Sequence, residues 1–95
     1  KLSDILIVSD IDGTLLYEKD GISAENREAI RNFTEKGGRF TVATGRAIDI
    51  TRSLLNGLSV NVPSIHINGG YLYDWDKLYY HKLSPFFFLL LHFFF

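Results

Sequence analysis

Three short strand-like runs, each followed directly by small, polar or charged residues, constrain the fold of this 95-residue chain more than any other feature. The runs occupy residues 5–8, 40–43 and 64–67, and the polar segments after them are residues 9–14, 44–46 and 68–70. The first run, Ile-Leu-Ile-Val, is mostly β-branched, which is typical of a strand covered on both faces in a parallel sheet. Ligands of open α/β sheets bind beyond the carboxyl ends of the strands, so we expect functional side chains in the three polar segments.

Two helices are predicted between these strands. Ser23 has the character of an N-cap, and Gly37 and Gly38 supply a left-handed stop. The apolar stripe of this first helix consists of Ala29, Ile30 and Phe33. The second helix is predicted to end at Asn56 and Gly57. Its apolar residues at helical spacing are Ala47, Ile50, Leu54 and Leu58.

Two β-hairpins complete the predicted order of elements. Asp20 and Gly21 form a tight-turn signal between apolar residues, which indicates a small hairpin or flap. Residues 71–73 and 78–81 alternate around a polar centre, which predicts a C-terminal hairpin with Trp75 at its tip. Strands that alternate with helices of this length imply right-handed crossovers. The sequence therefore predicts an α/β fold with a doubly wound, Rossmann-like parallel sheet.

Composition and charge exclude several classes of protein. Ten basic and eleven acidic side chains are mixed along the chain, so the net charge is −1 and there is no electrostatic footprint for nucleic acid or an anionic membrane. The absence of cysteine excludes disulfides and thiolate metal sites and suits a reducing compartment, so we expect a cytoplasmic protein. The N-terminus shows no secretory signal, and no apolar run is long enough to cross a bilayer.

Residues 86–95 differ from the rest of the chain, because they contain six Phe, three Leu and one His and no charged residue. Such a segment is a poor design for a soluble C-terminus. Three explanations stay open. The segment is native and docks onto an incomplete sheet, it comes from a frameshift or read-through of a T-rich gene sequence, or its residues are poorly determined. We therefore separate an apolar low-complexity tail, residues 84–95, from a domain at residues 1–83.

The two acids after the first strand carry the clearest chemical signal. Asp10 and Asp12 are separated by one residue, so on extended backbone they point to the same side and can converge on one ligand. Their mutual repulsion disfavours double ionisation unless a divalent cation compensates for it. One carboxylate can then act as a nucleophile while the other carries a proton for a leaving group. Gly13 lets the backbone approach an anion, and Thr14 adds a hydroxyl and an N–H.

Residues 10–15, Asp-Ile-Asp-Gly-Thr-Leu after an apolar strand, resemble the first motif of the haloacid dehalogenase (HAD) superfamily of phosphotransferases. Further segments resemble the Cof-type branch of this superfamily, which consists of small-metabolite phosphatases and includes sugar phosphatases. These segments are residues 23–29 with 37–38, 41–46 and 67–70. The resemblance implies that Asp10 attacks phosphorus, forms an aspartyl-phosphate and also binds magnesium (Mg²⁺). It implies that Asp12 protonates the leaving alcohol, then activates water, and offers its backbone carbonyl as a second metal ligand. Thr44 would hydrogen-bond a phosphoryl oxygen.

The other candidate residues have two interpretations each. Arg46 either contacts phosphate or substrate or is a solvated arginine at a helix start. Asn68 either meets the substrate or forms a turn before two glycines. His66 and His81 are expected to be packed or surface residues, because no second ligand stands at metal-binding spacing. The predicted substrate-binding set is Thr14, Thr44, Gly45, Arg46 and Asn68.

The resemblance also implies parts that these 95 residues do not contain. They are a cap domain that selects the substrate, a lysine, and an acidic pair that completes the magnesium shell. We therefore expect residues 1–83 to be the N-terminal part of a HAD-type core whose sheet is incomplete, with an open edge at the first strand. Such a chain is expected to be marginally stable, to self-associate through that edge and the tail, and to be nearly inactive.

Two functions are compatible with these observations. The first is a magnesium-dependent phosphohydrolase that acts on small phosphorylated metabolites, with sugar phosphates as one class. The alternative is a non-catalytic remnant or binding module that associates through its open sheet edge.

Overall fold

The computed structural model describes residues 1–16, 21–66 and 70–82 of the chain. Its elements, in order, are the 3-10 helix η1 (Leu2–Asp4), β1 (Leu6–Ser9), α1 (Ala24–Glu35), β2 (Arg39–Val42), α2 (Ile48–Leu55), β3 (Ser64–His66), β4 (Tyr71–Asp74) and β5 (Tyr79–Lys82). The predicted order of strands and helices is confirmed. The centre of the predicted flap and the apolar tail lie outside the described residues. None of the helices in the described part has the length and apolar character needed to span a membrane.

Helix α1 begins and ends as the sequence predicts. The Ser23 hydroxyl accepts a hydrogen bond from the Asn26 N–H at 3.1 Å, which satisfies one of the donors at the helix start. Beyond the helix, Gly37 has a φ of +99°, in the left-handed region where a side chain is strained. Gly38 is buried, and a Cβ at this position would overlap the Phe33 ring. The first glycine therefore turns the chain, and the second lets it pass close to the helix.

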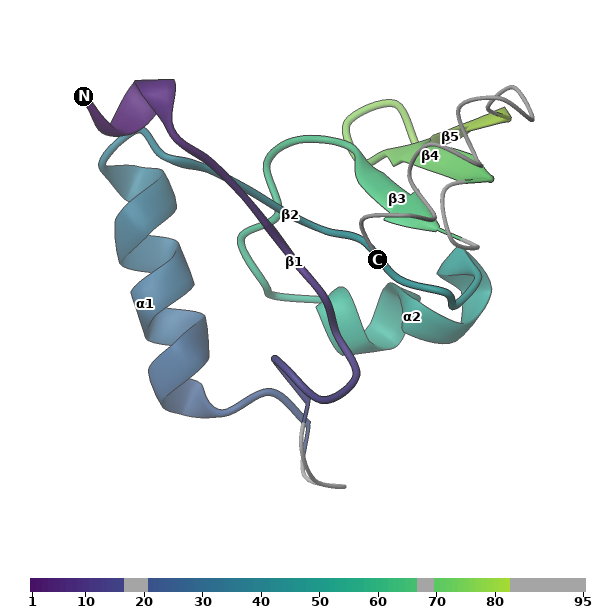
Figure 1. Cartoon of the computed structure of the whole chain (residues 1–95), viewed down its shortest axis with the longest axis horizontal. Coiled ribbons are helices and arrows are strands. Elements are labelled where there is room, and N and C mark those ends of the chain that lie inside the picture. The colour runs from purple at the N-terminus through teal and green to yellow at the C-terminus, as the bar shows by residue number, and fades with distance from the viewer. Residues whose placement is uncertain (17–20, 67–69, 83–95) are drawn as a thin grey trace.

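The strands form a parallel pair and a three-stranded antiparallel sheet (Figure 1). In the parallel pair, β1 and β2 align Ile7 with Phe40 and Ser9 with Val42. In the second sheet, β4 pairs antiparallel with both β3 and β5. The predicted C-terminal hairpin is therefore confirmed.

The third strand is joined to the parallel pair less extensively than we expected. Among the described residues, β3 meets the end of β2 through a single parallel bridge between Ala43 and Ile65. The Thr44 N–H donates to the Ile65 carbonyl, and the Thr41 hydroxyl donates to the Pro63 carbonyl, each at 2.9 Å. The Thr41 side chain thus joins β2 to the residue that precedes β3. The longer pairing of β3 is with β4.

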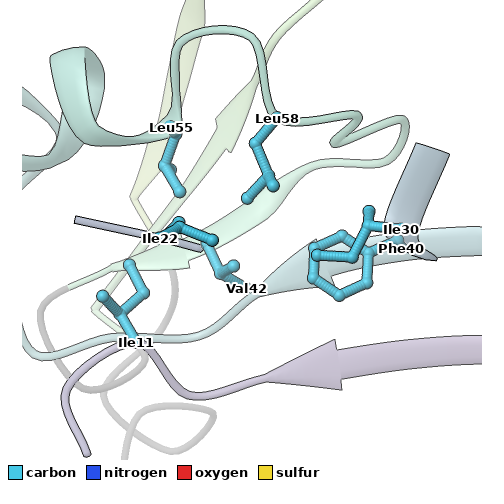
Figure 2. Close-up of a cluster of buried hydrophobic side chains, with 7 residues drawn as sticks. All are labelled: Ile11, Ile22, Ile30, Phe40, Val42, Leu55 and Leu58. Carbon is cyan, nitrogen blue, oxygen red and sulfur yellow. The ribbon is translucent and has the colours of Figure 1, made fainter. Parts of the chain in front are cut away.

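A core of seven buried apolar side chains joins α1, β2, α2 and the loops between elements (Figure 2). Phe40 and Val42 share one face of β2, because side chains two residues apart in a strand point the same way. The other members of the core are Ile11, Ile22, Ile30, Leu55 and Leu58. Ile11 lies between the two candidate acids and is fully buried. The loop that carries these acids is therefore fastened to the core by its central residue.

Strand β1 differs most from its sequence pattern. The pattern predicts cover on both faces, but Leu6 is 50% exposed, Ile7 43% and Val8 38%. In the described part of the chain β1 pairs with β2 alone, so its other edge has no strand partner there. An open groove of about 290 Å³ lies between β1 and α1, with Ile7 and Phe33 in its lining. In the part of the chain that the structure describes, the expected open edge is therefore present, and the expected burial is not.

We expect Ile7→Lys to reduce self-association of the chain, because a charged side chain on an open strand disfavours pairing with another strand. Sedimentation velocity over a range of protein concentrations measures this effect. Ile50→Lys is the matched control, since Ile50 is 62% exposed on α2 and lies outside the strands. An equal change in both variants would reflect added charge alone and would contradict a contact through β1.

Candidate active site

The loop after β1 turns tightly around a single carbonyl group. The Ile11 carbonyl accepts hydrogen bonds from the N–H groups of Thr14, Leu15 and Leu16 at 3.3, 3.1 and 2.9 Å. Gly13 follows the second acid with a φ of +78°, a conformation that favours glycine. Since the Ile11 side chain is buried, the residues on either side of it, Asp10 and Asp12, are held at the surface. The predicted convergence of the two acids on one side of the loop is compatible with this geometry.

Asp10 is exposed at the carboxyl end of β1. Its Oδ1 accepts the Ile11 N–H at 2.8 Å, and its backbone carbonyl accepts the Ser9 hydroxyl, also at 2.8 Å. The first of these contacts orients the carboxylate relative to the strand. One carboxylate oxygen is thus engaged with the backbone at the position where the sequence predicts a nucleophile.

The end of β2 lies beside the end of β1. The Ala43 N–H donates to the Ser9 carbonyl at 2.9 Å, so Thr44 leaves the sheet next to the loop of acids. Thr44 is buried, and its Oγ1 accepts the Arg46 N–H at 3.1 Å, while the intervening Gly45 is exposed. Two of the predicted segments are therefore brought together at one edge of the sheet.

Arg46 and Asp12 form a two-point ion pair that the sequence analysis did not anticipate. The Arg46 Nε–H donates to Asp12 Oδ2 at 3.0 Å, and an Nη2–H donates to Oδ1 at 2.6 Å. The side chains are 36% and 55% exposed, respectively, so the pair adds little to stability. The pair instead orients Asp12, because the planar guanidinium fixes the plane of the carboxylate. Thirty-four residues separate the two, and only the adjacent ends of β1 and β2 bring them together.

Behind Arg46 lies a buried polar cluster that the sequence analysis also missed. Ser64 and His66 are both fully buried on β3. Nε2 of His66 lies 2.6 Å from the Ser64 hydroxyl oxygen, and Nδ1 lies 3.1 Å from the Arg46 carbonyl oxygen. The indole N–H of Trp75 donates to the same Ser64 oxygen at 2.9 Å. The sequence indicates this cluster only through the spacing of Ser64 and His66, because side chains two residues apart in a strand point the same way.

Five further residues were singled out in the sequence. His66 is packed, as one of the two interpretations held, and His81 is exposed on β5. Trp75 follows β4 in the hairpin, where its ring packs edge-on against Tyr73 with the centroids 5.0 Å apart. Thr14 is exposed in the first loop. Asn68 lies outside the described residues.

We expect the free energy of unfolding to fall as the pH drops below about 6.5. Burial lowers the pKa of His66 below its ordinary value of 6.5, and the hydrogen bond to the Arg46 carbonyl opposes that shift only in part. In the interval between the lower folded pKa and 6.5, the unfolded chain binds more protons than the folded chain. The contribution of His66 to the free energy of unfolding is therefore fully present above pH 6.5. It is lost as the pH falls from 6.5 towards the lower pKa of the folded chain.

Urea denaturation at a series of pH values measures this dependence. His66→Asn removes the titrating group and is expected to flatten the profile below about pH 6.5. A slope that persists in His66→Asn would assign the effect to another group.

The two acids fit a magnesium ion in part. Magnesium prefers oxygen ligands and retains several waters, and the Asp10 carboxylate and the Asp12 backbone carbonyl are oxygen donors on one loop. Because Arg46 holds both carboxylate oxygens of Asp12, the carbonyl of this residue is the better candidate ligand. Within residues 1–16, 21–66 and 70–82, no group of three His, Cys, Asp or Glu side chains is placed to hold a metal. The described part therefore offers an incomplete shell.

Comparison with known proteins gives consistent results. The family described as haloacid dehalogenase-like hydrolase matches residues 7–89. The 5-amino-6-(5-phospho-D-ribitylamino)uracil phosphatase YwtE of Bacillus subtilis is 46% identical over 68 residues, which cover 72% of this chain and 23% of the relative. The pyridoxal phosphate phosphatase YbhA of Escherichia coli is 34% identical over 70 residues, 74% of this chain and 26% of the relative. The chain thus spans about a quarter of the length of these curated relatives.

Solved structures match the same part of the chain. A haloacid dehalogenase-like hydrolase from Bacteroides thetaiotaomicron superposes with a TM-score of 0.73 at 33% identity, over 82% of this chain and 30% of that protein. A second such hydrolase, from B. subtilis, gives a TM-score of 0.69 at 36% identity, over 84% of this chain and 28% of that protein. The fold and the sequence matches therefore agree.

Proposed function

The chain belongs to the haloacid dehalogenase-like hydrolases, and from that membership we propose that it carries the nucleophile of a magnesium-dependent phosphatase of small phosphorylated metabolites. The observation that carries the proposal is the placement of Asp10 and Asp12 on a loop beside Thr44 and Arg46 at the ends of two parallel strands. Relatives that are named phosphatases support it. Their names concern a phosphorylated ribityl compound and pyridoxal phosphate, so a phosphate ester of a small metabolite is the substrate class we propose.

In the proposed reaction Asp10 and Asp12 have separate roles. A carboxylate oxygen of Asp10 attacks phosphorus, forms a new O–P bond and displaces the alcohol oxygen, which takes a proton from Asp12. In the second step Asp12 takes a proton from water as that water attacks the same phosphorus and releases Asp10. Both oxygens of Asp12 accept from Arg46, and each keeps a second lone pair on which Asp12 can hold a proton.

The neighbouring groups would orient the phosphate. The Thr44 hydroxyl accepts from the Arg46 N–H and so retains its own hydrogen for a phosphoryl oxygen, which is the contact we propose for it. Gly45 and Thr14 are exposed on the same two segments and remain candidates for backbone and hydroxyl contacts with the phosphate. A bound magnesium ion would neutralise charge on the phosphoryl oxygens, and the Asp10 carboxylate with the Asp12 carbonyl would hold it.

A chimaera tests the proposal. Residues 1–82 replace the corresponding N-terminal part of the B. subtilis phosphatase YwtE, which is 46% identical over the matched residues. We expect the purified chimaera to hydrolyse p-nitrophenyl phosphate and to lose this activity when magnesium is removed with a chelator. The unaltered relative is the positive control. A chimaera with the relative's circular dichroism and thermal unfolding but without hydrolysis would contradict the proposal.

The 95-residue chain by itself is expected to show no measurable hydrolysis of the same ester. The reason is that the described residues provide a nucleophile and part of a metal shell, and phosphoryl transfer also needs neutralisation of the equatorial oxygens. Phosphate release in the presence of magnesium measures this. Hydrolysis by the chain that Asp10→Asn abolishes would overturn the expectation.

The second candidate function is a binding module without catalysis, and the exposed apolar strand β1 favours it. Leu6, Ile7 and Val8 form a continuous exposed run beside an open edge, which is a template for addition of another strand. The Asp10→Asn variant distinguishes the two functions, because it should remove catalysis in the chimaera and leave association through β1 unchanged.

A further inference from the structure

The buried cluster behind Arg46 has a defined proton arrangement. The Arg46 carbonyl can only accept, so the 3.1 Å contact with Nδ1 of His66 requires a proton on Nδ1. The Trp75 indole can only donate, so Ser64 Oγ accepts from it and directs its own proton elsewhere. That proton has an acceptor at Nε2 of His66, 2.6 Å away. The hydrogen bonds therefore run in one direction, from Trp75 through Ser64 and His66 to the Arg46 carbonyl.

The neutral Nδ1–H tautomer satisfies every member of this chain of hydrogen bonds. In the opposite tautomer, bare Nδ1 would face the carbonyl oxygen with no proton between them, and the Ser64 proton would lose its acceptor. Both changes would leave polar atoms unpaired in a buried place, which is costly. In the described part of the chain, every buried side-chain nitrogen and oxygen has a hydrogen-bond partner. Protonation of both nitrogens is disfavoured because His66 is fully buried.

Arg46 is held at three points by these contacts. Its carbonyl accepts from His66, its N–H donates to Thr44 Oγ1 at 3.1 Å, and its guanidinium donates twice to Asp12. With both backbone polar groups fixed, the start of the side chain has a defined position and direction. The guanidinium can then meet Asp12 with little further loss of conformational freedom.

We propose that His66 is a positioning residue of the active site, which fixes the Arg46 backbone in its Nδ1–H tautomer and thereby aligns Arg46 with Asp12. Ser64 and Trp75 select the tautomer. Neither His66 nor Ser64 is exposed to solvent, so both act through Arg46 and not on a substrate. The role of Asp12 in proton transfer rests on the proposed function, but the alignment of the Arg46–Asp12 pair is a property of the folded chain.

The first test is nitrogen NMR of the unaltered 95-residue chain labelled with ¹⁵N in histidine, near neutral pH. We expect one histidine, removed by His66→Asn, to show a protonated Nδ1 and an unprotonated Nε2. A protonated Nε2 on this residue would overturn the proposal.

The second test compares two substitutions of similar chemistry. In His66→Asn the amide nitrogen lies near the place of Nδ1 and can still donate to the Arg46 carbonyl. In His66→Gln the amide nitrogen lies near the place of Nε2 and loses that contact. We expect hydrogen exchange of the Arg46 Nε–H to be about tenfold faster in His66→Gln than in the unaltered chain, and His66→Asn to restore most of the protection.

An internal control separates a local change from unfolding. The Arg27 guanidinium donates to the carbonyls of Ile22, Asn56 and Leu54 at 3.4, 3.2 and 3.3 Å, away from His66. Its Nε–H exchange should be the same in all three proteins. Equal Arg46 exchange in the Asn and Gln variants, with Arg27 unchanged, would overturn the positioning role. Because these signals do not depend on catalysis, an inactive chimaera whose Arg46 is protected as expected would count against the proposed function alone.

Discussion

Replacing Asp10 by Asn in the chimaera is expected to reduce kcat for p-nitrophenyl phosphate by about a thousandfold or more, because a neutral amide cannot serve as the attacking carboxylate. The fold should be unaffected, since Asp10 is exposed and the amide oxygen can accept the hydrogen bond from the Ile11 N–H. Rapid-mixing absorbance measurements of p-nitrophenolate follow both the first turnover and the steady state. We expect neither phase to be measurable in this variant.

Asp12→Asn provides the mechanistic contrast. Loss of a general acid and base costs about a hundredfold to ten thousandfold in rate, but p-nitrophenolate leaves readily without a proton. We therefore expect a stoichiometric burst of p-nitrophenolate followed by slow turnover, because hydrolysis of the aspartyl-phosphate still lacks its base. Asp4→Asn is the matched control, since Asp4 is an exposed acid in η1 and should leave both phases intact. A burst in Asp10→Asn would show that another residue accepts the phosphoryl group.

The second large effect is a loss of stability, which we expect when alanine replaces a buried isoleucine and expect to be much smaller when it replaces a partly exposed one. Ile11→Ala should lower the free energy of unfolding by about 2 to 5 kcal/mol, because Ile11 is fully buried in the core beneath the active-site loop. Ile7→Ala should cost about 1 kcal/mol or less, because Ile7 is 43% exposed on β1. Small domains have a total stability of about 5 to 15 kcal/mol, so the loss expected for Ile11→Ala is a large fraction of the total at the lower end of that range.

Urea denaturation followed by Trp75 fluorescence and by circular dichroism measures both variants. The sequence pattern alone predicts the larger loss of stability for Ile7→Ala, since Ile7 lies in an apolar run and Ile11 lies in a polar turn. A larger loss for Ile7→Ala than for Ile11→Ala would mean that β1 is covered in solution, by a second copy of the chain or by a segment outside the described residues. Repeating the measurement at several protein concentrations separates these two cases.

Local interactions made much of the fold predictable. Ser23 caps α1 through its own side chain, and Gly37 ends it through its own backbone, so neither depends on distant residues. The hairpin of β4 and β5 follows from alternation around a short turn. By contrast, the exposure of β1 depends on how many strands lie beside it, and an apolar run does not contain that information.

The candidate site likewise has features that depend on neighbouring residues in the chain and features that depend on distant ones. The spacing of Asp10 and Asp12 is local, and the segments that follow β1 and β2 were expected at one edge of a sheet. The partner of Asp12 was not predictable, because a surface arginine at a helix start can reach several groups. His66 was expected to be packed or exposed, but its contact with Arg46 requires β3 to lie at the end of β2.

The order of strands and helices, the position of the two acids after the first strand and the family resemblance could all be predicted from the amino-acid sequence. These properties depend on residues close together in the chain. The contacts of Arg46 with Asp12 and His66, the burial of Ile11 and the partial exposure of β1 became visible in the folded chain alone. The physical reason is that burial and hydrogen-bond partners are set by neighbours in space, and residues 12, 46, 66 and 75 become neighbours only when the strands pair.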